Sequence, residues 1–353
     1  MKPKPNTINN ILRIKPIKLM ILTLKLLWSS ISYVKEQIFF GRKIRKIEIE
    51  KDPVFILGFP RSGTTLLFRL LAADPQFAYI KVFDLIFPYA SRTFTKMVKP
   101  LLQRFFNKFN IKEKIVTNKA FDLDMPEEED TYLASHGSKY SVAWSFIFPV
   151  SSSRLYRRHI EFNEPGSKDK WMKRYTYLLK KILYKRRKKQ LLLKNPSSTA
   201  RINTLLEMFP NAKFIYIYRN PIYVYSSSCR VFEKAEQHVS VQRFGKQDTE
   251  DAIFDFYELT MDHYQRGSKN IPKKNLIEIR YEDFINKKYE TVKHIYKKLN
   301  IPGFNLAEKS IVELVDKENS FKPTTHKFPE EKYLQLEKKF HKYIKLLGYN
   351  RKP

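Results

Sequence analysis

The sequence predicts an α/β fold in which helices flank a central parallel β-sheet. Short apolar runs, such as residues 54–57 and 214–218, alternate with longer segments of helical periodicity. A loop that starts and ends in glycine, residues 58–63, connects the first of these runs to a helix. Strands that alternate with helices are typical of a parallel sheet covered on both faces.

The length and composition are those of a folded protein with a substantial core. The chain has 353 residues, of which 42% are hydrophobic and 14% aromatic, and this excludes a mostly disordered chain. The length allows one large α/β domain or two smaller ones. We expect residues 1–50 to form a separate N-terminal region and residues 51–353 to form the main folded domain.

The charge indicates anionic partners. The 67 lysines and arginines exceed the 36 acidic residues by 67 − 36 = 31. Nucleic acid, an anionic membrane surface and small anionic substrates all fit this excess, and lysines that only solvate the surface are the alternative. The single cysteine, Cys229, excludes an intramolecular disulfide and favours a reducing, cytoplasmic compartment. The scattered histidines predict no metal site.

Residues 1–50 predict a basic amphipathic helix. They hold 11 basic and 3 acidic residues, a net charge of 11 − 3 = +8. Polar positions recur at helical spacing, and the rest of the helix surface is apolar: Met20, Leu24, Leu27, Trp28, Ile31 and Val34. This pattern favours a helix lying in a membrane surface, peripheral at the inner face of the cell membrane. A helix packed on the protein's own core is the alternative. A spanning helix needs ~20 consecutive apolar residues, and Lys25 interrupts the apolar run. No cleavage site of small residues follows this run, so a signal peptide is not expected.

The remaining elements follow from the same reasoning in chain order. A helix is expected to begin at Pro126, because proline and acidic residues favour the first turn of a helix. Two helices should flank Pro302-Gly303. The other expected strands and helices are strands at 54–57, 191–193, 214–218 and 276–279, and helices at 64–73, 91–120, 171–184, 201–208 and from Ile222 onward.

The loop at residues 58–63 has the glycine frame of a P-loop. Its place between an apolar strand and a helix is typical of loops whose backbone amides surround an anion. An ATP-binding loop has lysine after the second glycine, whereas this chain has Thr64. Positive charge comes instead from Arg61, and the strand 214–218 is followed by Arg219 and not by an acid that could hold magnesium. We therefore predict a P-loop-type domain that binds an anion without a metal.

A second anion site is expected after the strand 214–218. Arg219 comes at the end of this strand, and the proline two residues later starts a helix that carries Ser227. Ligands of open parallel sheets bind at the carboxyl ends of the strands. A guanidinium there can bind a phosphate through two parallel hydrogen bonds.

Together, Gly58–Thr65 and Arg219–Ser227 resemble the two signatures of the sulfotransferases that use 3′-phosphoadenosine 5′-phosphosulfate (PAPS). The resemblance implies that Arg219 and Ser227 hold the 3′-phosphate. Ser226 and Ser228 flank Ser227, so the match is fixed only to within one position. His326 or Lys327 is a further candidate for the 3′-phosphate. The resemblance also implies that the 5′-phosphosulfate is bound by Arg61, Ser62, Gly63, Thr64 and Thr65.

Other segments are similar to the bacterial carbohydrate-type branch of this family, so that the resemblance covers roughly residues 53–350. They include the acidic run 126–130, Lys194-Asn-Pro196 and Tyr281-Glu-Asp283. One position departs from the pattern, because many relatives carry a histidine where this chain has Ser198. No role of that histidine is transferred.

The position of Lys194 at a strand end next to the loop makes it one catalytic candidate, and the resemblance favours a glutamate of the acidic run as the other. Lys194 would neutralise the charge that develops on the leaving phosphate, although an ordinary surface lysine is the alternative. A glutamate of the acidic run would act as the base for the acceptor hydroxyl. We favour Glu128, with Glu282 and Asp283 as weaker candidates and an ordinary helix start as the alternative.

We therefore predict a sulfotransferase that moves a sulfuryl group from PAPS to a hydroxyl and leaves 3′-phosphoadenosine 5′-phosphate. The acceptor is expected to be a carbohydrate or glycolipid, with a small-molecule hydroxyl as a further option. A P-loop nucleotide kinase or NTPase is one alternative, which lacks its lysine and its magnesium ligand here. A nucleic-acid-binding protein is another, suggested by the net charge and the basic run 185–189, but no nucleic-acid motif accompanies them. A sulfotransferase fold that only binds its ligand is the third.

Overall fold

The computed structural model describes residues 13–87, 92–111, 122–187, 189–318 and 328–349. The chain divides into two compact units. Unit 1 comprises Met1–Glu48, Ile80–Lys185 and Cys229–Phe256, and unit 2 comprises Ile49–Tyr79, Arg186–Ser228 and Tyr257–Pro353. The predicted division into an N-terminal region, residues 1–50, and a main domain, residues 51–353, stays a prediction.

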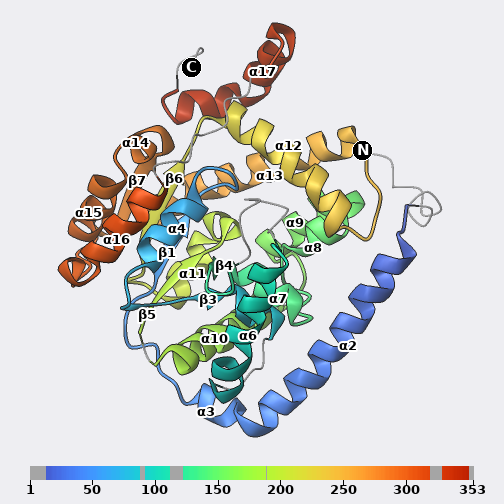
Figure 1. The fold of residues 1–353 in the computed structure, drawn as a ribbon. Helices are drawn as coiled ribbons and strands as arrows, with labels where there is room; N and C mark the ends of the chain where they lie inside the picture. The colour runs from blue at the N-terminus through green and yellow to red at the C-terminus, as the bar shows by residue number, and fades with distance from the viewer. Residues whose placement is uncertain (1–12, 88–91, 112–121, 188, 319–327, 350–353) are drawn as a thin grey trace. The chain divides into compact units, whose positions relative to one another are not determined.

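Unit 2 is built on a five-stranded sheet in the order β2-β5-β1-β6-β7 (Figure 1). All its strand pairs are parallel, which confirms the predicted central parallel sheet. Every residue of β1 and β5 is buried, as expected for parallel strands covered on both faces. The strands are β1 (Val54–Leu57), β2 (Phe77–Ala78), β5 (Gln190–Lys194), β6 (Lys213–Tyr218) and β7 (Leu276–Arg280).

Helices separate these strands along the chain, as the sequence predicts. The helices of unit 2 are α4 (Thr64–Ala72), α11 (Ile202–Met208), α14 (Tyr281–Asn286), α15 (Lys288–Lys298), α16 (Phe304–Glu318) and α17 (Glu330–Leu346). Short 3₁₀ turns occupy Pro196–Ala200, Ser268–Asn270 and Lys273–Asn275. Two longer helices, α12 (Pro221–His238) and α13 (Lys246–Gly267), contribute residues to both units.

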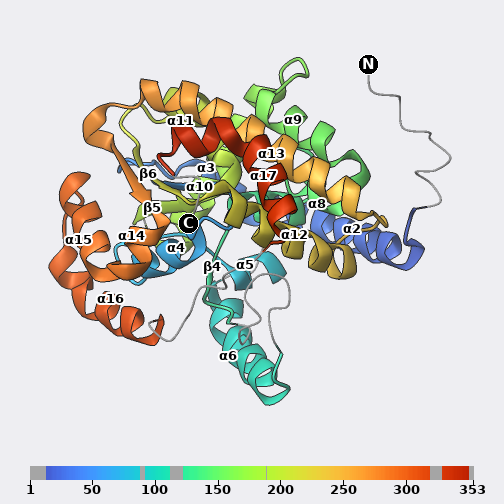
Figure 2. The same cartoon turned by 90° about the horizontal axis from the view of Figure 1, so that it is seen from above.

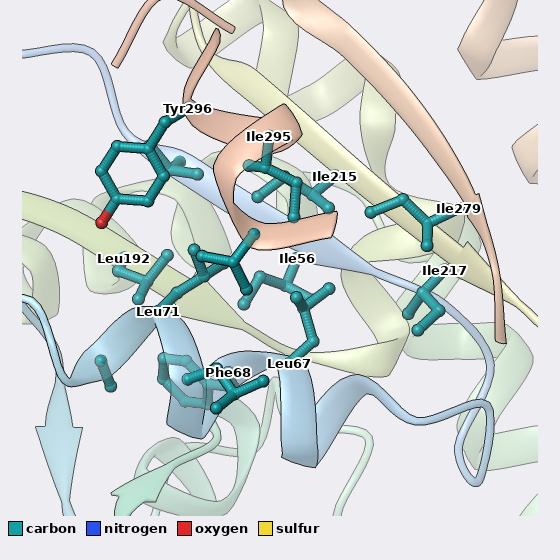
Figure 3. Close-up of a cluster of buried hydrophobic side chains, with 14 of the residues drawn as sticks. Ile56, Leu67, Phe68, Leu71, Leu192, Ile215, Ile217, Ile279, Ile295 and Tyr296 are labelled. Carbon is teal, nitrogen blue, oxygen red and sulfur yellow. The ribbon is translucent and has the colours of Figure 1, made fainter. Parts of the chain in front are cut away.

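One face of the sheet packs against α4, α15 and α16. Figure 3 shows Leu67 and Phe68 of α4 and Ile295 of α15 beside strand residues such as Ile56 and Ile215. Most of these side chains are fully buried. Burial of apolar surface on this scale is the main favourable term in folding, so the helices hold β1 and the start of α4 in fixed positions.

The opposite face carries the alternate residues of the same strands. Phe55 of β1 stacks on Phe214 of β6, with ring centroids 5.5 Å apart. Tyr216 of β6 stacks on Tyr264 of α13 at 3.7 Å. Successive side chains of a strand point to opposite faces, so both faces of the central strands are packed.

Unit 1 is mainly helical. Its one small sheet pairs β3 (Ile80–Lys81) with β4 (Pro126–Glu127) in antiparallel fashion. Figure 2 shows α6 extending away from the other helices of this unit. The helices are α2 (Pro16–Phe39), α3 (Gly41–Arg45), α5 (Val82–Ile86), α6 (Arg92–Lys108), α7 (Glu129–Ser135), α8 (Trp144–Ile147), α9 (Ser152–Glu161) and α10 (Ser167–Arg186), with a 3₁₀ turn at Pro149–Ser151.

Two sequence predictions about unit 1 are corrected. The helix expected over 91–120 is shorter, because α6 ends at Lys108 and Asn110 has a left-handed φ of 48° that does not continue a helix; residues 112–121 lie outside the described residues. Pro126 does not start a helix, because it belongs to β4. The helix begins at Glu129, and its first turn is acidic, as the sequence predicts.

Candidate functional site

The candidate anion-binding groups of unit 2 lie at the carboxyl ends of neighbouring strands. The glycine loop follows β1, Lys194 is the last residue of β5, and Arg219 follows β6. The register pairs Ile56 with Lys194 and Leu57 with Tyr216. Because all these strands are parallel, their carboxyl ends meet at one edge of the sheet. The structure thus brings together the predicted loop, Lys194 and Arg219.

Both glycines of the loop are required by its geometry. Gly58 has φ 148°, and a Cβ atom there would lie 2.4 Å from the backbone oxygen of Ile217. Gly63 has φ 95°, and its Cβ atom would lie 2.5 Å from Cδ2 of Tyr281. These approaches leave no room for a side chain, so the backbone of the loop packs directly on β6 and on the start of α14. The loop amides precede the N-terminus of α4, where the helix favours an anion.

A threonine that the sequence analysis did not single out holds the start of this loop. The amide of Gly58 donates a hydrogen bond of 2.8 Å to Oγ1 of Thr199, which is fully buried. Thr199 follows Ser198 in the 3₁₀ turn after β5. Its role could have been suspected from its place beyond Lys194-Asn-Pro196, but no spacing rule predicts the bond.

Arg61 connects the two predicted anion sites. Its Nε donates a hydrogen bond of 2.9 Å to Oγ of Ser227 on α12, and Nη1 of Arg219 lies 3.5 Å from the carbonyl oxygen of Arg61. Arg61 also has a left-handed φ of 74°, an uncommon conformation for a residue other than glycine. The loop arginine, Arg219 and Ser227 therefore form one continuous group.

Polar atoms in this group are buried without a hydrogen-bond partner in the described residues. They are Nε of Arg219 and Oγ of Ser228. A buried polar group without a partner is costly, and a phosphate would satisfy both donors. Ser228 flanks the predicted Ser227, so the structure keeps the one-position ambiguity of the sequence: Ser227 binds Arg61, and the Ser228 hydroxyl has no hydrogen-bond partner within the described part of the chain.

Tyr281 completes the surroundings of Arg219. The guanidinium lies 4.3 Å from the centroid of the Tyr281 ring, which also limits the space at Gly63. Burial raises the pKa of Tyr281, while the positive charges of Arg219 and Arg61 oppose this shift. A neutral aromatic ring against a guanidinium restricts its orientation and gives a cation–π attraction. The family resemblance includes the segment Tyr281-Glu-Asp283, but the sequence does not predict this contact of Tyr281 with Arg219.

Lys194 is not an ordinary surface lysine. Its exposed fraction is 3%, and its Nζ atom lies 5.9 Å from the centroid of the Phe68 ring. A buried ammonium is costly unless its surroundings compensate for its charge. Its position at the end of β5, beside the loop that follows β1, supports the predicted role.

The other predicted residues lie elsewhere. Glu128 belongs to unit 1, where it is half-buried and precedes α7, so its role as base stays a prediction. His326 and Lys327 lie outside the described residues. Glu282 accepts a hydrogen bond of 2.7 Å from the Tyr349 hydroxyl, which fits a structural role. Among the residues that the structure describes, no cluster of three His, Cys, Asp or Glu side chains could hold a metal ion.

The contacts at Gly63 lead to a testable expectation. Gly63→Ala should weaken binding of 3′-phosphoadenosine 5′-phosphate at least about 10-fold, because the methyl group must displace Tyr281 in addition to the cost of about 1–2 kcal/mol for a left-handed alanine. Gly348→Ala is the matched control, since Gly348 has φ 66° and a Cβ atom there would meet no other atom within 4 Å. Calorimetric titration of both variants measures the difference, and equal affinities would contradict the assigned contact.

The chain is similar to known proteins both in sequence and in fold. A sequence model described as the sulfotransferase family matches residues 53–305. The omega-hydroxy-beta-dihydromenaquinone-9 sulfotransferase Stf3 of Mycobacterium bovis is 25% identical over 318 residues, which cover 90% of this chain and 80% of that protein. The protein of the same name from Mycobacterium tuberculosis matches equally well.

Solved structures agree with the fold. The sulfotransferase STF9 from Mycobacterium avium superposes with a TM-score of 0.72 at 18% identity, covering 90% of this chain and 82% of that one. The sulfotransferase STF1 from Mycobacterium tuberculosis gives a TM-score of 0.62 at 18% identity, covering 88% and 80%. At this identity the likeness concerns the fold alone.

Proposed function

Because the chain belongs to the sulfotransferase family, we propose that it transfers the sulfuryl group of PAPS to a hydroxyl on a lipid-linked acceptor. Family membership makes the chain a sulfotransferase enzyme and implies PAPS as the donor. It weighs against the kinase and nucleic-acid alternatives. The carbohydrate-type branch and the identity of the acceptor remain proposals.

The observation that carries the proposal is the pair of donors without partners beside the loop. Arg219 Nε and Ser228 Oγ are buried without a hydrogen bond in the described residues, while Arg61 connects the loop to the neighbouring Ser227. A ligand with two anionic ends would use both sites at once. The bisphosphate product of PAPS has such ends, whereas ATP carries all its phosphates at one end.

The roles of the residues follow from their positions. When bound, PAPS supplies an activated sulfuryl group whose leaving group is a phosphate. The loop amides, Arg61 and the hydroxyls of Thr64 and Thr65 would hold the 5′ end, as the sequence predicts. Lys194 would stabilise negative charge that grows on the leaving oxygen, a contribution that is strong in a site shielded from water. Glu128 is proposed to accept the proton of the acceptor hydroxyl.

The acceptor is proposed on two grounds. The sequence resembles the carbohydrate-type branch, which favours a sugar hydroxyl on a glycolipid. The relative Stf3 is named for a hydroxylated menaquinone, which is a lipid alcohol. Both candidates place the hydroxyl on a lipid, and we propose that the reaction takes place on the cytoplasmic side of the membrane.

Calorimetric titration tests the donor site. Tight binding of 3′-phosphoadenosine 5′-phosphate without binding of ATP and magnesium is expected. Arg61→Ala and Arg219→Ala should each weaken this binding about 10- to 150-fold, because each removes hydrogen bonds to a charged group worth about 1.5–3 kcal/mol. Arg266→Ala, on the exposed part of α13, is the control and should bind normally. Unchanged affinity in both site variants would overturn the donor site.

Transfer of radiolabelled sulfate tests the acceptor class. Hydroxylated menaquinone and a glycosyl diacylglycerol are offered in detergent micelles, with free glucose as the soluble comparison. Product with either lipid and none with glucose is expected. Product with glucose at a similar rate would overturn the lipid-linked acceptor but leave the donor site standing.

A further inference from the structure

We infer that α2, with the basic α3 that follows it, docks on the surface of an anionic phospholipid bilayer and lies parallel to the membrane plane. The inference rests on the exposure, contacts and charge of these two helices. It does not depend on the identity of the acceptor. By length and composition α2 could also cross a membrane, so its contacts decide between the two arrangements.

The outer face of α2 is an apolar stripe. Of the 24 residues of α2, all of them described, only Ser29 and Glu36 are buried. The apolar side chains are 54% to 71% exposed, which is far above the level of core residues. Their spacing of three and four residues places them on one side of the helix. The stripe consists of Ile17, Met20, Ile21, Leu24, Leu27, Trp28, Ile31, Val34, Ile38 and Phe39.

The inner face of α2 is bound to the rest of unit 1 near the N-terminal end of the helix. The amide of Lys15, just before the helix, donates a hydrogen bond of 2.8 Å to the carbonyl oxygen of Val241. The Lys15 side chain forms an ion pair with Glu236. One turn further, Nζ of Lys18 donates a hydrogen bond of 2.5 Å to the carbonyl oxygen of Gln237.

The C-terminal end of α2 is bound to the same unit. Glu36 forms a buried ion pair of 2.5 Å with Lys181 of α10. The hydroxyl of Tyr177, also on α10, donates a hydrogen bond of 2.9 Å to Glu36. Both ends of α2 are therefore held on one side by one unit, as a single unbroken helix (Figure 1). A spanning helix would have its ends on opposite sides of the bilayer, whereas this arrangement leaves one long face for lipid.

Charge favours an anionic lipid surface as the partner. Arg42, Lys43 and Arg45 of α3 are all exposed directly after α2, and α3 has no acidic residue. Each basic residue near an anionic membrane contributes about 1 kcal/mol. Lys35 lies within the stripe, and its ammonium group can reach the headgroups while its methylene chain lies along the apolar surface. Trp28 is a residue type enriched at membrane interfaces.

The same charges disfavour a second copy of the chain as the partner. A two-fold symmetric contact places equal surfaces against each other. Stripes that run in the same direction would bring the basic α3 segments of both copies close together, and like charges repel; stripes that run antiparallel would leave both segments without a countercharge. An anionic bilayer covers the apolar stripe and neutralises the basic segment at once, so it fits both observations.

Flotation with vesicles tests the docking surface. The full chain is mixed with vesicles of pure phosphatidylcholine, or of phosphatidylcholine and phosphatidylglycerol in equal parts. Strong binding to the mixed vesicles is expected. Leu24→Ser/Leu27→Ser/Trp28→Ser should reduce it at least about 100-fold through lost apolar burial. Leu306→Ser/Leu334→Ser is the matched control in unit 2, because these residues are 82% and 57% exposed, and it should bind normally.

A second variant tests the contribution of the basic helix α3 to membrane binding. Arg42→Gln/Lys43→Gln/Arg45→Gln should weaken binding to the mixed vesicles about 10- to 100-fold, and added salt should weaken binding of the unchanged chain. Two results would overturn the proposal. One is that the unchanged chain does not bind the mixed vesicles. The other is that the Leu24/Leu27/Trp28 triple variant unfolds at the same temperature as the unchanged chain and binds these vesicles equally well. A dimer that does not float, and that the triple variant converts to a monomer, would assign the stripe to self-association.

Depth measurements separate an in-plane helix from a spanning one. Nitroxide labels are attached to cysteines placed at Ile17, Leu24 and Ile31, in a Cys229→Ser background. These positions lie seven residues apart on one face, so an in-plane helix gives one shallow depth at all three. A helix that crosses the bilayer advances about 1.5 Å per residue and gives depths that differ by roughly 10 Å between neighbouring labels. The second result would overturn the in-plane arrangement.

Discussion

Lys194→Met is expected to lower kcat about 10²- to 10³-fold with little change in the binding of 3′-phosphoadenosine 5′-phosphate. Lys194 ends β5 at the edge of the sheet where the glycine loop and Arg219 lie, and its side chain is buried. Methionine replaces the methylene chain of lysine with an apolar chain of similar length and removes the charge. Loss of one preorganised donor to a developing oxyanion typically costs about 2.7–4 kcal/mol of transition-state stabilisation. This energy corresponds to the expected decrease of kcat by about 10²- to 10³-fold.

Steady-state kinetics with a fixed acceptor checks this expectation. Lys274→Met is the control, because Lys274 is exposed in the 3₁₀ turn just before β7, at the amino end of that strand. Lys194→Arg should recover part of the activity, since it restores the charge with a different shape. An unchanged kcat in Lys194→Met would show that the buried lysine serves the fold alone.

Lys181→Met is expected to destabilise unit 1 by about 3–5 kcal/mol. Lys181 and Glu36 form an ion pair in which both side chains are 4% exposed. Methionine cannot donate a hydrogen bond to the buried Glu36 carboxylate, which Nζ of Lys181 can do in either charge state, and breaking a buried pair by removing one partner costs this much. The double variant Glu36→Gln/Lys181→Met removes both charges and should recover most of the loss.

Hydrogen exchange of the α10 amides measures this effect within unit 1, because a chain with two units need not unfold in one step. Arg157→Ala/Glu161→Ala is the control, a pair one turn apart on α9 in which Arg157 is exposed and Glu161 is half-buried, and ion pairs near the surface contribute at most about 1 kcal/mol. Equal protection in Lys181→Met and in the unchanged chain would contradict the buried pair.

The same pair predicts a pH dependence. Burial lowers the pKa of Lys181 to about 7, and the attraction of Glu36 offsets this only in part. Above pH 7 the unfolded chain therefore binds a proton that the folded chain has released, so stability rises with pH. The stability of unit 1, relative to that of the double variant, should increase as the pH is raised from 7 towards 10. A decrease over this range would contradict the lowered pKa.

Much of the fold could be predicted from local patterns. Apolar runs gave the strands β1, β5, β6 and β7, and their alternation with helices indicated the parallel sheet. These predictions hold because periodicity and burial act over a few residues. The predictions at Pro126 and at residues 109–111 were wrong, since proline and acidic residues fit a strand followed by a helix as well as a helix start, and a run of lysines does not mark where a helix ends.

By itself, the sequence determined the parallel α/β sheet, the glycine loop after β1 and the arginine after β6. The loop could be recognised because the backbone approaches at Gly58 and Gly63 exclude every residue with a side chain. Only the tertiary structure decided the bond from Gly58 to Thr199, the burial of Lys194, and the pairing of Glu36 with Lys181. These features join segments far apart in the chain. Such contacts depend on which strands and helices become neighbours, and no local pattern of residues determines that.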